Sequence, residues 1–220
     1  MAQLLFDFDG TLVDSAPGIL ESMRAAFTAT GLTARIPMTE LINGLPLRAA
    51  LVRALGADDL PRIARLEAAF REHYDGVGHR GTRPYPGIPA ALDALRAAGH
   101  RLHIVTNKRL APTQLILAQL QWDALFDTVN TLDSSPGLQR KSEVVARLLS
   151  GIGGPATATM IGDTEEDAAA ALDNGLPFVW VRWGYGREAR PQGNSHEVTS
   201  VAAMLQCLLP FAGVSRSPAP

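Results

Sequence analysis

The chain has 220 residues, of which 46% are hydrophobic and 19% charged, proportions that exclude wholesale disorder and are typical of a globular protein. Its formal net charge of -2 provides no overall positive field to attract nucleic acid or an anionic membrane. The N-terminus lacks the features of a signal peptide, and no run is long enough to span a membrane, so we expect a cytoplasmic protein. The single cysteine, Cys207, lies in an apolar run and is expected to be a buried, inert thiol.

The first predicted element is a buried strand from Leu4 to Phe8, because a short apolar run is followed directly by Asp9 and Gly10. Two acids, Asp7 and Asp9, would lie at its carboxyl end. Side chains alternate along an extended segment, so these two acids are expected to point to the same side with one residue between them.

The segment 15–83 predicts an inserted domain made only of helices, because its apolar residues follow a helical period and no convincing strand occurs. The chain would leave the core at a hinge near Asp14. It would return through a second hinge at 76–87, a stretch rich in glycine and proline. Three or four helices are expected, among them one capped by Ser15 and ending at Gly31, one from Leu47 to Leu55, and one from Arg62 to Tyr74.

Beyond the insert, short apolar runs alternate with helical stretches, each bounded by turn residues. Such alternation predicts a doubly wound, Rossmann-like α/β core with a parallel sheet. We expect residues 1–14 and 84–220 to form this core. Strands are expected over Arg101 to Thr106, Phe126 to Asn130, Thr157 to Gly162 and Pro177 to Trp183, and helices over Ile88 to Ala98, Leu110 to Leu120, Lys141 to Leu149 and Glu165 to Asp173.

Polar residues gather where three of the predicted strands end. In an open parallel sheet, ligands collect in the crevice outside the carboxyl ends of the strands. A lysine, Lys141, begins a helix between the second and third of these strand ends. The three strand ends are Asp7-Phe8-Asp9, Thr106-Asn107-Lys108 and Gly162-Asp163-Thr164-Glu165-Glu166-Asp167.

Carboxylates gathered in one crevice repel one another, and a bound divalent cation would relieve that repulsion. Oxygen ligands in the absence of a Cys or His cluster favour Mg²⁺ over zinc. The cation and Lys141 would reduce the charge of a bound phosphate dianion, so that Asp7 can attack its phosphorus. Asp9 would protonate the leaving oxygen and later activate water against the aspartyl phosphate.

In these residues and their order, the sequence resembles the haloacid dehalogenase-like hydrolases over nearly its whole length. The insert resembles the mobile cap of the phosphoglycolate-phosphatase-like branch, and Tyr85-Pro86-Gly87 and Trp183-Gly184-Tyr185-Gly186 also fit that branch. The matching segments are Asp7 to Ser15 for the family's first motif, Ile104 to Asn107 for the second, Lys141 for the third, and Ile161 to Asp167 for the fourth.

The resemblance implies a phosphatase acting on a small phosphorylated metabolite such as phosphoglycolate. It implies that Asp7 and Asp163 bind Mg²⁺ through their side chains and Asp9 through its main-chain carbonyl. Thr106 and Lys141 would hold the phosphoryl group. Asp167 would support Lys141.

Two further residues, Asn107 and Arg48, are candidates for substrate binding. Arg48 ends the segment Asn43 to Arg48, which we interpret as a loop facing the crevice, and its guanidinium group could grip a carboxylate or phosphate. The alternative is a solvated side chain, which is common for arginine on a helix. His73 and His79 have a spacing that matches no metal site.

Several functions stay open on sequence grounds. A dehalogenase is disfavoured because members that release halide usually lack an acid at the position of Asp9. Phosphonate cleavage is disfavoured because it relies on a lysine in the cap, and the only lysines here are Lys108 and Lys141. A phosphosugar mutase and a non-catalytic phosphate-binding or scaffold protein remain alternatives. The expected partner is a small phosphorylated metabolite, and the expected state is a monomer or weak homodimer.

Overall fold

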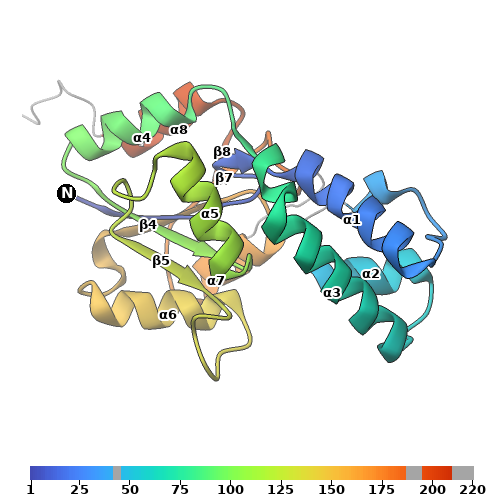
Figure 1. Cartoon of the computed structure of the whole chain (residues 1–220). Helices are drawn as coiled ribbons and strands as arrows, with labels where there is room; N and C mark the ends of the chain where they lie inside the picture. Colours follow the sequence, from blue (N-terminus) through green and yellow to red (C-terminus); the bar gives the residue numbers. More distant parts are fainter. Residues whose placement is uncertain (42–45, 187–194, 210–220) are drawn as a thin grey trace, which may run out of the picture.

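A six-stranded parallel sheet forms the centre of the computed structural model, which describes residues 1–41, 46–186 and 195–209 (Figure 1). The strand order is β5-β4-β1-β6-β7-β8, so the first strand of the chain lies inside the sheet between two later ones. This order confirms the predicted doubly wound α/β fold. The strands are β1 (Gln3–Phe6), β4 (Arg101–Thr106), β5 (Thr128–Thr131), β6 (Ala158–Gly162), β7 (Phe178–Val181) and β8 (Ser195–Val198).

Both faces of the sheet are covered by helices, as the alternation of buried residues along β1 requires. Leu4 and Phe6 belong to one hydrophobic cluster and Leu5 to the other, because successive side chains of a strand point to opposite faces. The helices α4 (Ile88–Ala97), α5 (Leu110–Leu120) and α8 (Val201–Leu208) cover the first face, and α6 (Lys141–Gly151) and α7 (Glu165–Asp173) cover the second (Figure 1).

The helical insert packs around a hydrophobic cluster of its own, formed by buried residues such as Met23, Leu51 and Phe70. Within its described residues no strand is present until the chain returns toward the sheet, as predicted. The predicted domain boundaries, with residues 1–14 and 84–220 as the core and residues 15–83 as the insert, stay a prediction. The elements are α1 (Ala16–Thr30), the 3-10 turn η1 (Met38–Leu41), α2 (Leu47–Leu55), α3 (Leu60–Gly76) and the 3-10 turn η2 (Gly78–Gly81), all on one side of the core in Figure 1.

The two crossings between core and insert lie side by side. A short strand, β2 (Val13–Asp14), pairs antiparallel with β3 (Arg83–Pro84). The sequence predicted two hinges here but no strands, since two-residue strands have no periodicity to detect. The pairing fixes where the insert leaves and rejoins the core.

The last two elements of the described chain, β8 and α8, were not predicted, and the expectation that Cys207 is buried is wrong. β8 (Ser195–Val198) has the sequence Ser-His-Glu-Val and lies at the edge of the sheet, so it lacks the apolar run of a central strand. Cys207 is exposed rather than buried. Cys207 belongs to α8, in which Met204 is the buried residue. Successive residues of a helix point in different directions, so some residues of an apolar run lie on the outer face of the helix.

The sequence of the tail, Ser215 to Pro220, predicts a frayed end, and this segment lies outside the described residues. In the parts of the chain that the structure describes, no helix has both the length and the apolar character needed to cross a bilayer.

Candidate active site

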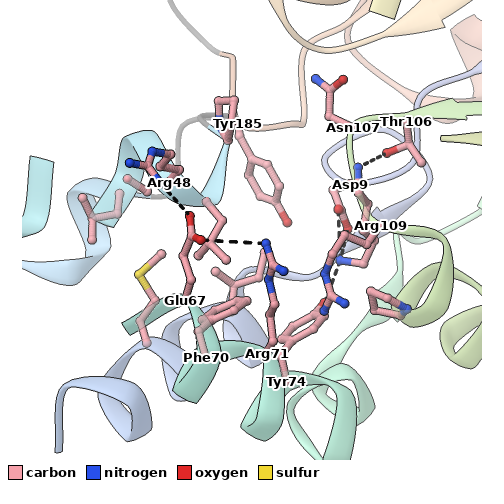
Figure 2. Close-up of a pocket in the computed structure, with 18 of the residues that line it drawn as sticks. Asp9, Arg48, Glu67, Phe70, Arg71, Tyr74, Thr106, Asn107, Arg109 and Tyr185 are labelled. Atoms are coloured by element: carbon pink, nitrogen blue, oxygen red, sulfur yellow. Dashed lines mark hydrogen bonds and ion pairs between the residues drawn. The ribbon is translucent and has the colours of Figure 1, made fainter. Parts of the chain in front are cut away.

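A cavity of about 350 Å³ lies between the carboxyl ends of the central strands and the helical insert (Figure 2). The core lines it with Asp7, Asp9, Thr106, Asn107 and Lys141. The insert lines it with residues of α1, α2 and α3. Thr164 and Glu166 also line it, so the structure brings residues of all three predicted strand ends to one cavity.

Three acids and one lysine form a buried cluster at the core side of this cavity. Asp7, Asp163 and Asp167 are 5%, 1% and 0% exposed, and each offers a carboxylate oxygen within 4.8 Å of the others. Lys141 donates from Nζ to Asp7 Oδ1 at 2.7 Å and to Asp167 Oδ1 at 2.6 Å. The lysine thus holds two of the acids together.

Backbone groups and small residues place Asp163. Its carboxylate accepts hydrogen bonds from Thr11 Oγ1 at 3.1 Å and from the backbone N–H of Tyr185 at 2.6 Å. Gly10 has a φ of 88° and lies against the same carboxylate, so a side chain at residue 10 would be strained and would also collide with it. The loop after β1 therefore depends on glycine at this position.

Asp167 is fixed from the start of α7. Its Oδ2 accepts from the backbone N–H groups of Asp163 at 3.2 Å and Thr164 at 3.0 Å, while Thr164 Oγ1 accepts from the backbone N–H of Asp167 at 3.3 Å. This is a reciprocal capping box in which aspartate takes the usual place of glutamate. It leaves Oδ1 of Asp167 free to bind Lys141.

Burial and mutual repulsion perturb the acids of the cluster. Burial, followed by the charge of Asp167, raises the pKa of Asp7 well above its usual range. The same two causes raise the pKa of Asp163 to about 6. Burial lowers the pKa of Lys141, but the charges of Asp167 and Asp7 outweigh it and the pKa rises above the ordinary lysine value. One lysine does not neutralise three buried carboxylates, and all three offer oxygen as the donor atom. This set of ligands fits a Mg²⁺ ion.

Asp9 and Thr106 face the cavity beside this cluster. The Asp9 side chain is 23% exposed and accepts two hydrogen bonds from Lys108 Nζ, at 3.2 and 3.1 Å. Thr106 is buried, and its hydroxyl oxygen accepts from the backbone N–H of Lys108 at 3.2 Å. Asn107 Nδ2 donates to Glu166 Oε2 at 2.7 Å. Asp9 is thus not one of the three clustered acids, and its carboxylate is turned toward Lys108.

Arg48 lines the cavity from the first turn of α2 (Figure 2). Its side chain is 51% exposed, and Nη1 lies 4.0 Å from Glu67 Oε1. Glu67 also lies 3.9 Å from Arg71 Nη2. The other part of the predicted loop, Asn43 to Leu45, lies outside the described residues.

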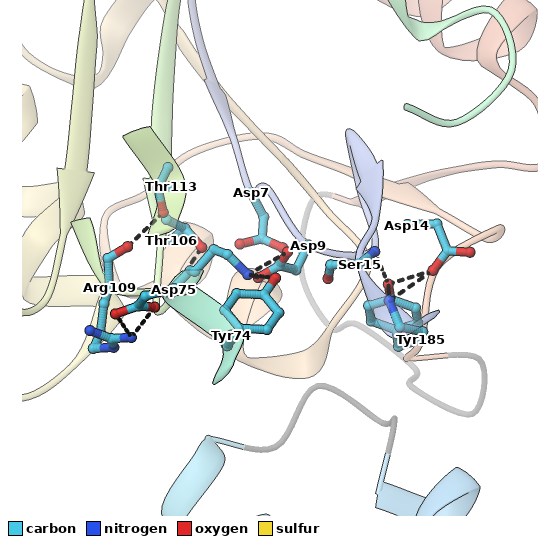
Figure 3. Close-up of polar contacts among 12 residues, drawn as sticks. Asp7, Asp9, Asp14, Ser15, Tyr74, Asp75, Thr106, Arg109, Thr113 and Tyr185 are labelled. Atoms are coloured by element: carbon cyan, nitrogen blue, oxygen red, sulfur yellow. Dashed lines mark hydrogen bonds and ion pairs between the residues drawn. The ribbon is translucent and has the colours of Figure 1, made fainter. Parts of the chain in front are cut away.

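Ser15 does not cap α1 through its side chain, in contrast to the prediction. Its Oγ is buried with no hydrogen-bond partner among the described residues. The Tyr185 hydroxyl accepts instead from the backbone N–H groups of Ser15 at 2.8 Å and Ala16 at 3.0 Å, and donates to Asp14 Oδ1 at 2.9 Å (Figure 3). A residue distant in sequence therefore satisfies the donors at the helix start.

Each of Trp183, His73 and His79 has a structural contact. Trp183 donates from Nε1 to the Thr11 carbonyl at 3.1 Å and packs edge-on against Tyr85. His79 Nδ1 lies 3.1 Å from the carbonyl oxygen of Tyr74, and His73 Nδ1 lies 2.9 Å from the Ser22 hydroxyl. These side chains support the fold, and neither histidine belongs to the acid cluster.

Sequence reasoning missed Lys108 and Tyr74 as site residues. Lys108 directly follows Thr106 and Asn107, so its position in a polar strand end was a usable signal. Tyr74 had none, because an aromatic residue on an amphipathic helix is usually part of a core. Glu67 and Arg71 were missed for a different reason, because charged residues on a helix are usually solvated.

Comparison with known proteins gives consistent findings. A sequence model of the haloacid dehalogenase-like hydrolase family matches residues 4–181. A phosphoglycolate phosphatase of Cereibacter sphaeroides is 35% identical over 192 residues, which cover 84% of this chain and 87% of that protein. The tyrosine-protein kinase PtkA of Mycobacterium tuberculosis is 32% identical over 215 residues, which cover 96% of this chain and 72% of the kinase.

A solved structure shares the fold over nearly its whole length. A haloacid dehalogenase-like hydrolase of Streptococcus pneumoniae aligns with a TM-score of 0.84 at 26% identity, covering 95% of this chain and 99% of that one. The helical insert is therefore part of the shared architecture.

Proposed function

This chain belongs to the haloacid dehalogenase-like hydrolases, in their phosphoglycolate-phosphatase-like branch, and we propose that it is a Mg²⁺-dependent phosphatase of a small phosphorylated metabolite. The observation that carries the proposal is the arrangement of two kinds of acid around one cavity. Asp7 is buried and held by Lys141, whereas Asp9 is partly exposed beside it. The proposed reaction needs a nucleophile held beside a cationic group and an acid-base group that substrate and water can reach, and Asp7 and Asp9 fit these two roles.

In the proposed reaction, a carboxylate oxygen of Asp7 attacks phosphorus and the ester oxygen leaves with a proton from Asp9. Water then attacks the phosphorus of the aspartyl phosphate, and Asp9 takes the proton from that water. This releases inorganic phosphate and restores both acids. Thr106 binds a phosphoryl oxygen through its hydroxyl group, and the ammonium group of Lys141 stabilises negative charge at the same place.

Asp7 and Asp163 would bind Mg²⁺ through side-chain oxygens, and Asp9 through its main-chain carbonyl. When bound, the ion supplies charge neutralisation for the phosphate and the carboxylates. Asp167 stays with Lys141, and this ion pair keeps the lysine directed at Asp7.

The residues with which the insert lines the cavity are the basis for proposing a small anionic substrate. Arg48 and Arg71 both lie near Glu67, and apolar side chains such as Ile19 and Phe70 line the neighbouring wall. A carboxylate of a substrate could replace Glu67 as the partner of Arg48. Phosphoglycolate and similar phosphorylated acids are therefore the leading substrate class.

The proposed function is tested by phosphate release from a panel of phosphorylated acids, sugars and nucleotides, together with 4-nitrophenyl phosphate. We expect release only with Mg²⁺, loss of release with a chelator, and the highest kcat/KM for a small phosphorylated acid. Release that persists at full rate after chelation would contradict the metal requirement. Absence of release from every compound would end the proposal.

Mg²⁺ should also stabilise the folded protein, since it binds a cluster that only the folded chain assembles. At about 100 times its Kd, a ligand of the folded state adds about 2.7 kcal/mol to the free energy of unfolding. Thermal unfolding with and without Mg²⁺ measures the effect. In Asp163→Asn the stabilisation should be largely lost at the same Mg²⁺ concentration, whereas an equal gain in this variant would place the ion elsewhere.

Phosphoryl transfer to a protein tyrosine is a second candidate, favoured by the similarity to the kinase PtkA. With ATP as donor, a kinase would form phosphotyrosine on an acceptor protein, whereas a phosphatase would release free phosphate. Hydrolysis is preferred because Asp9 lies in a cavity that a water molecule can share with a phosphorylated Asp7.

A further inference from the structure

Lys108 connects an acid of the core with a tyrosine of the helical insert. Its Nζ donates to the two carboxylate oxygens of Asp9 at 3.2 and 3.1 Å and to the Tyr74 hydroxyl at 2.8 Å. The same nitrogen lies 4.6 Å from the centre of the Tyr74 ring, and the side chain of Lys108 is only 7% exposed. Lys108 is therefore held from both sides of the cavity.

The orientation of the Asp9 carboxylate depends on this lysine. Within residues 1–41, 46–186 and 195–209, Lys108 is the only group that donates a hydrogen bond to it. Asp9 is 23% exposed and follows the end of β1, so regular strand pairing does not fix its side chain. Without Lys108, the carboxylate would be free to rotate in the cavity.

Tyr74 is in turn fixed by the insert. It is 2% exposed and belongs to the insert's hydrophobic cluster. Its ring stacks on that of Phe70 with a centre-to-centre distance of 5.4 Å and an interplanar angle of 9°. Figure 3 shows the Tyr74 hydroxyl directed toward Asp9. The position of α3 therefore determines where Lys108 is held.

We infer that Lys108 is a positioning residue that orients the Asp9 carboxyl group toward the leaving oxygen, and that Tyr74 fixes Lys108 in that place. The inference rests on the proposed role of Asp9 as the proton donor. It assigns to the insert a part in the chemistry beyond enclosing the substrate, because a residue of α3 sets the geometry of proton transfer.

A neighbouring ion pair provides a matched control. Arg109 Nη2 donates to Asp75 Oδ1 and Oδ2 at 2.6 and 2.8 Å. Arg109 and Asp75 are the residues that follow Lys108 and Tyr74, and they join the same two elements. Among the described residues this pair makes no hydrogen bond or ion pair with Asp9, so Asp75→Asn weakens the attachment of the insert and leaves the hydrogen bonds from Lys108 to Asp9 in place.

The test compares substrates whose leaving groups need a proton to different extents. The first substrate is the alkyl phosphate of the panel with the highest kcat/KM, whose leaving alkoxide oxygen is basic and needs a proton. The second is 4-nitrophenyl phosphate, whose leaving phenolate is stabilised and needs a proton less. In Lys108→Met, kcat/KM should fall about 100-fold for the alkyl ester, since general acid catalysis contributes 10²–10⁴-fold, and about 3-fold for the aryl ester. Tyr74→Phe should show the same selectivity with about a 10-fold loss, and Asp75→Asn less than about 3-fold for either ester.

A second measurement asks whether the effects of Lys108→Met and Tyr74→Phe on kcat/KM add in the double variant. If Tyr74 acts through Lys108, the double variant should be no slower on the alkyl ester than Lys108→Met alone. Unfolding midpoints of each variant report whether it is folded, and the alkyl-to-aryl ratio within one variant is independent of the amount of active protein.

Equal losses for both esters in Lys108→Met would overturn the inference, as would losses in Asp75→Asn equal to those in Tyr74→Phe. A rise in KM with unchanged kcat would instead make Lys108 a substrate ligand and also overturn it. A wild-type protein that hydrolyses neither ester would end the proposed function and, with it, this inference.

Discussion

Replacing Asp7 by asparagine should lower kcat by at least about 10⁴-fold, since removal of a catalytic nucleophile costs several orders of magnitude. The carboxamide has nearly the size of the carboxylate and can still accept a hydrogen bond from Lys141. It cannot form the acyl phosphate. Phosphate release from the best substrate of the panel, at saturating substrate and Mg²⁺, measures the effect.

Asp123→Asn is the matched control, because Asp123 is exposed and is not among the residues that line the cavity. Its turnover should equal that of the wild type. Urea unfolding should show that Asp7→Asn is folded. Turnover of this variant within tenfold of the wild type would remove Asp7 as the nucleophile.

Replacing Lys141 by alanine should destabilise the protein by about 3–5 kcal/mol, the usual effect of removing one partner from a buried ion pair. Lys141 is 4% exposed at its side chain and is bound to two acids that are 7% and 0% exposed. The substitution leaves both without their cation. Urea unfolding at neutral pH measures the loss, and turnover should fall as well because the phosphoryl group loses a positive partner.

Two variants separate this effect from a general loss of charge pairs. Arg62→Ala removes an exposed pair with Asp59 and should change the free energy of unfolding by less than about 1 kcal/mol. Adding Asp167→Asn to Lys141→Ala should recover part of the stability, since one unpaired buried charge is then removed. A Lys141→Ala protein as stable as the Arg62→Ala protein would contradict the buried network.

The position of the acid cluster could be predicted from sequence because it depends on two local facts. Asp7 and Asp163 each follow an apolar strand, and carboxyl ends of parallel strands share an edge. Lys141 begins a helix that returns to the same edge. Those signals are short-range, so neither the strand order nor the exact packing of the insert was needed.

Contacts that depend on how the insert packs could not be predicted in this way. The bonds from Lys108 to Tyr74 and from Tyr185 to the start of α1 join residues that are 34 and 170 positions apart. No periodicity encodes such pairs. For the same reason, the exposed Cys207 was taken for a core residue, since apolar neighbours in sequence do not show which helix face is covered.

Direct detection of the phosphorylated residue tests the central claim, that Asp7 receives the phosphoryl group. A slow dephosphorylation variant, Asp9→Asn, would be incubated with 4-nitrophenyl phosphate and Mg²⁺, quenched in acid, reduced with borohydride and sequenced by mass spectrometry. Borohydride converts an aspartyl phosphate to homoserine. We predict homoserine at residue 7 alone, whereas modification at another residue, or nitrophenolate release with none at residue 7, would contradict the mechanism.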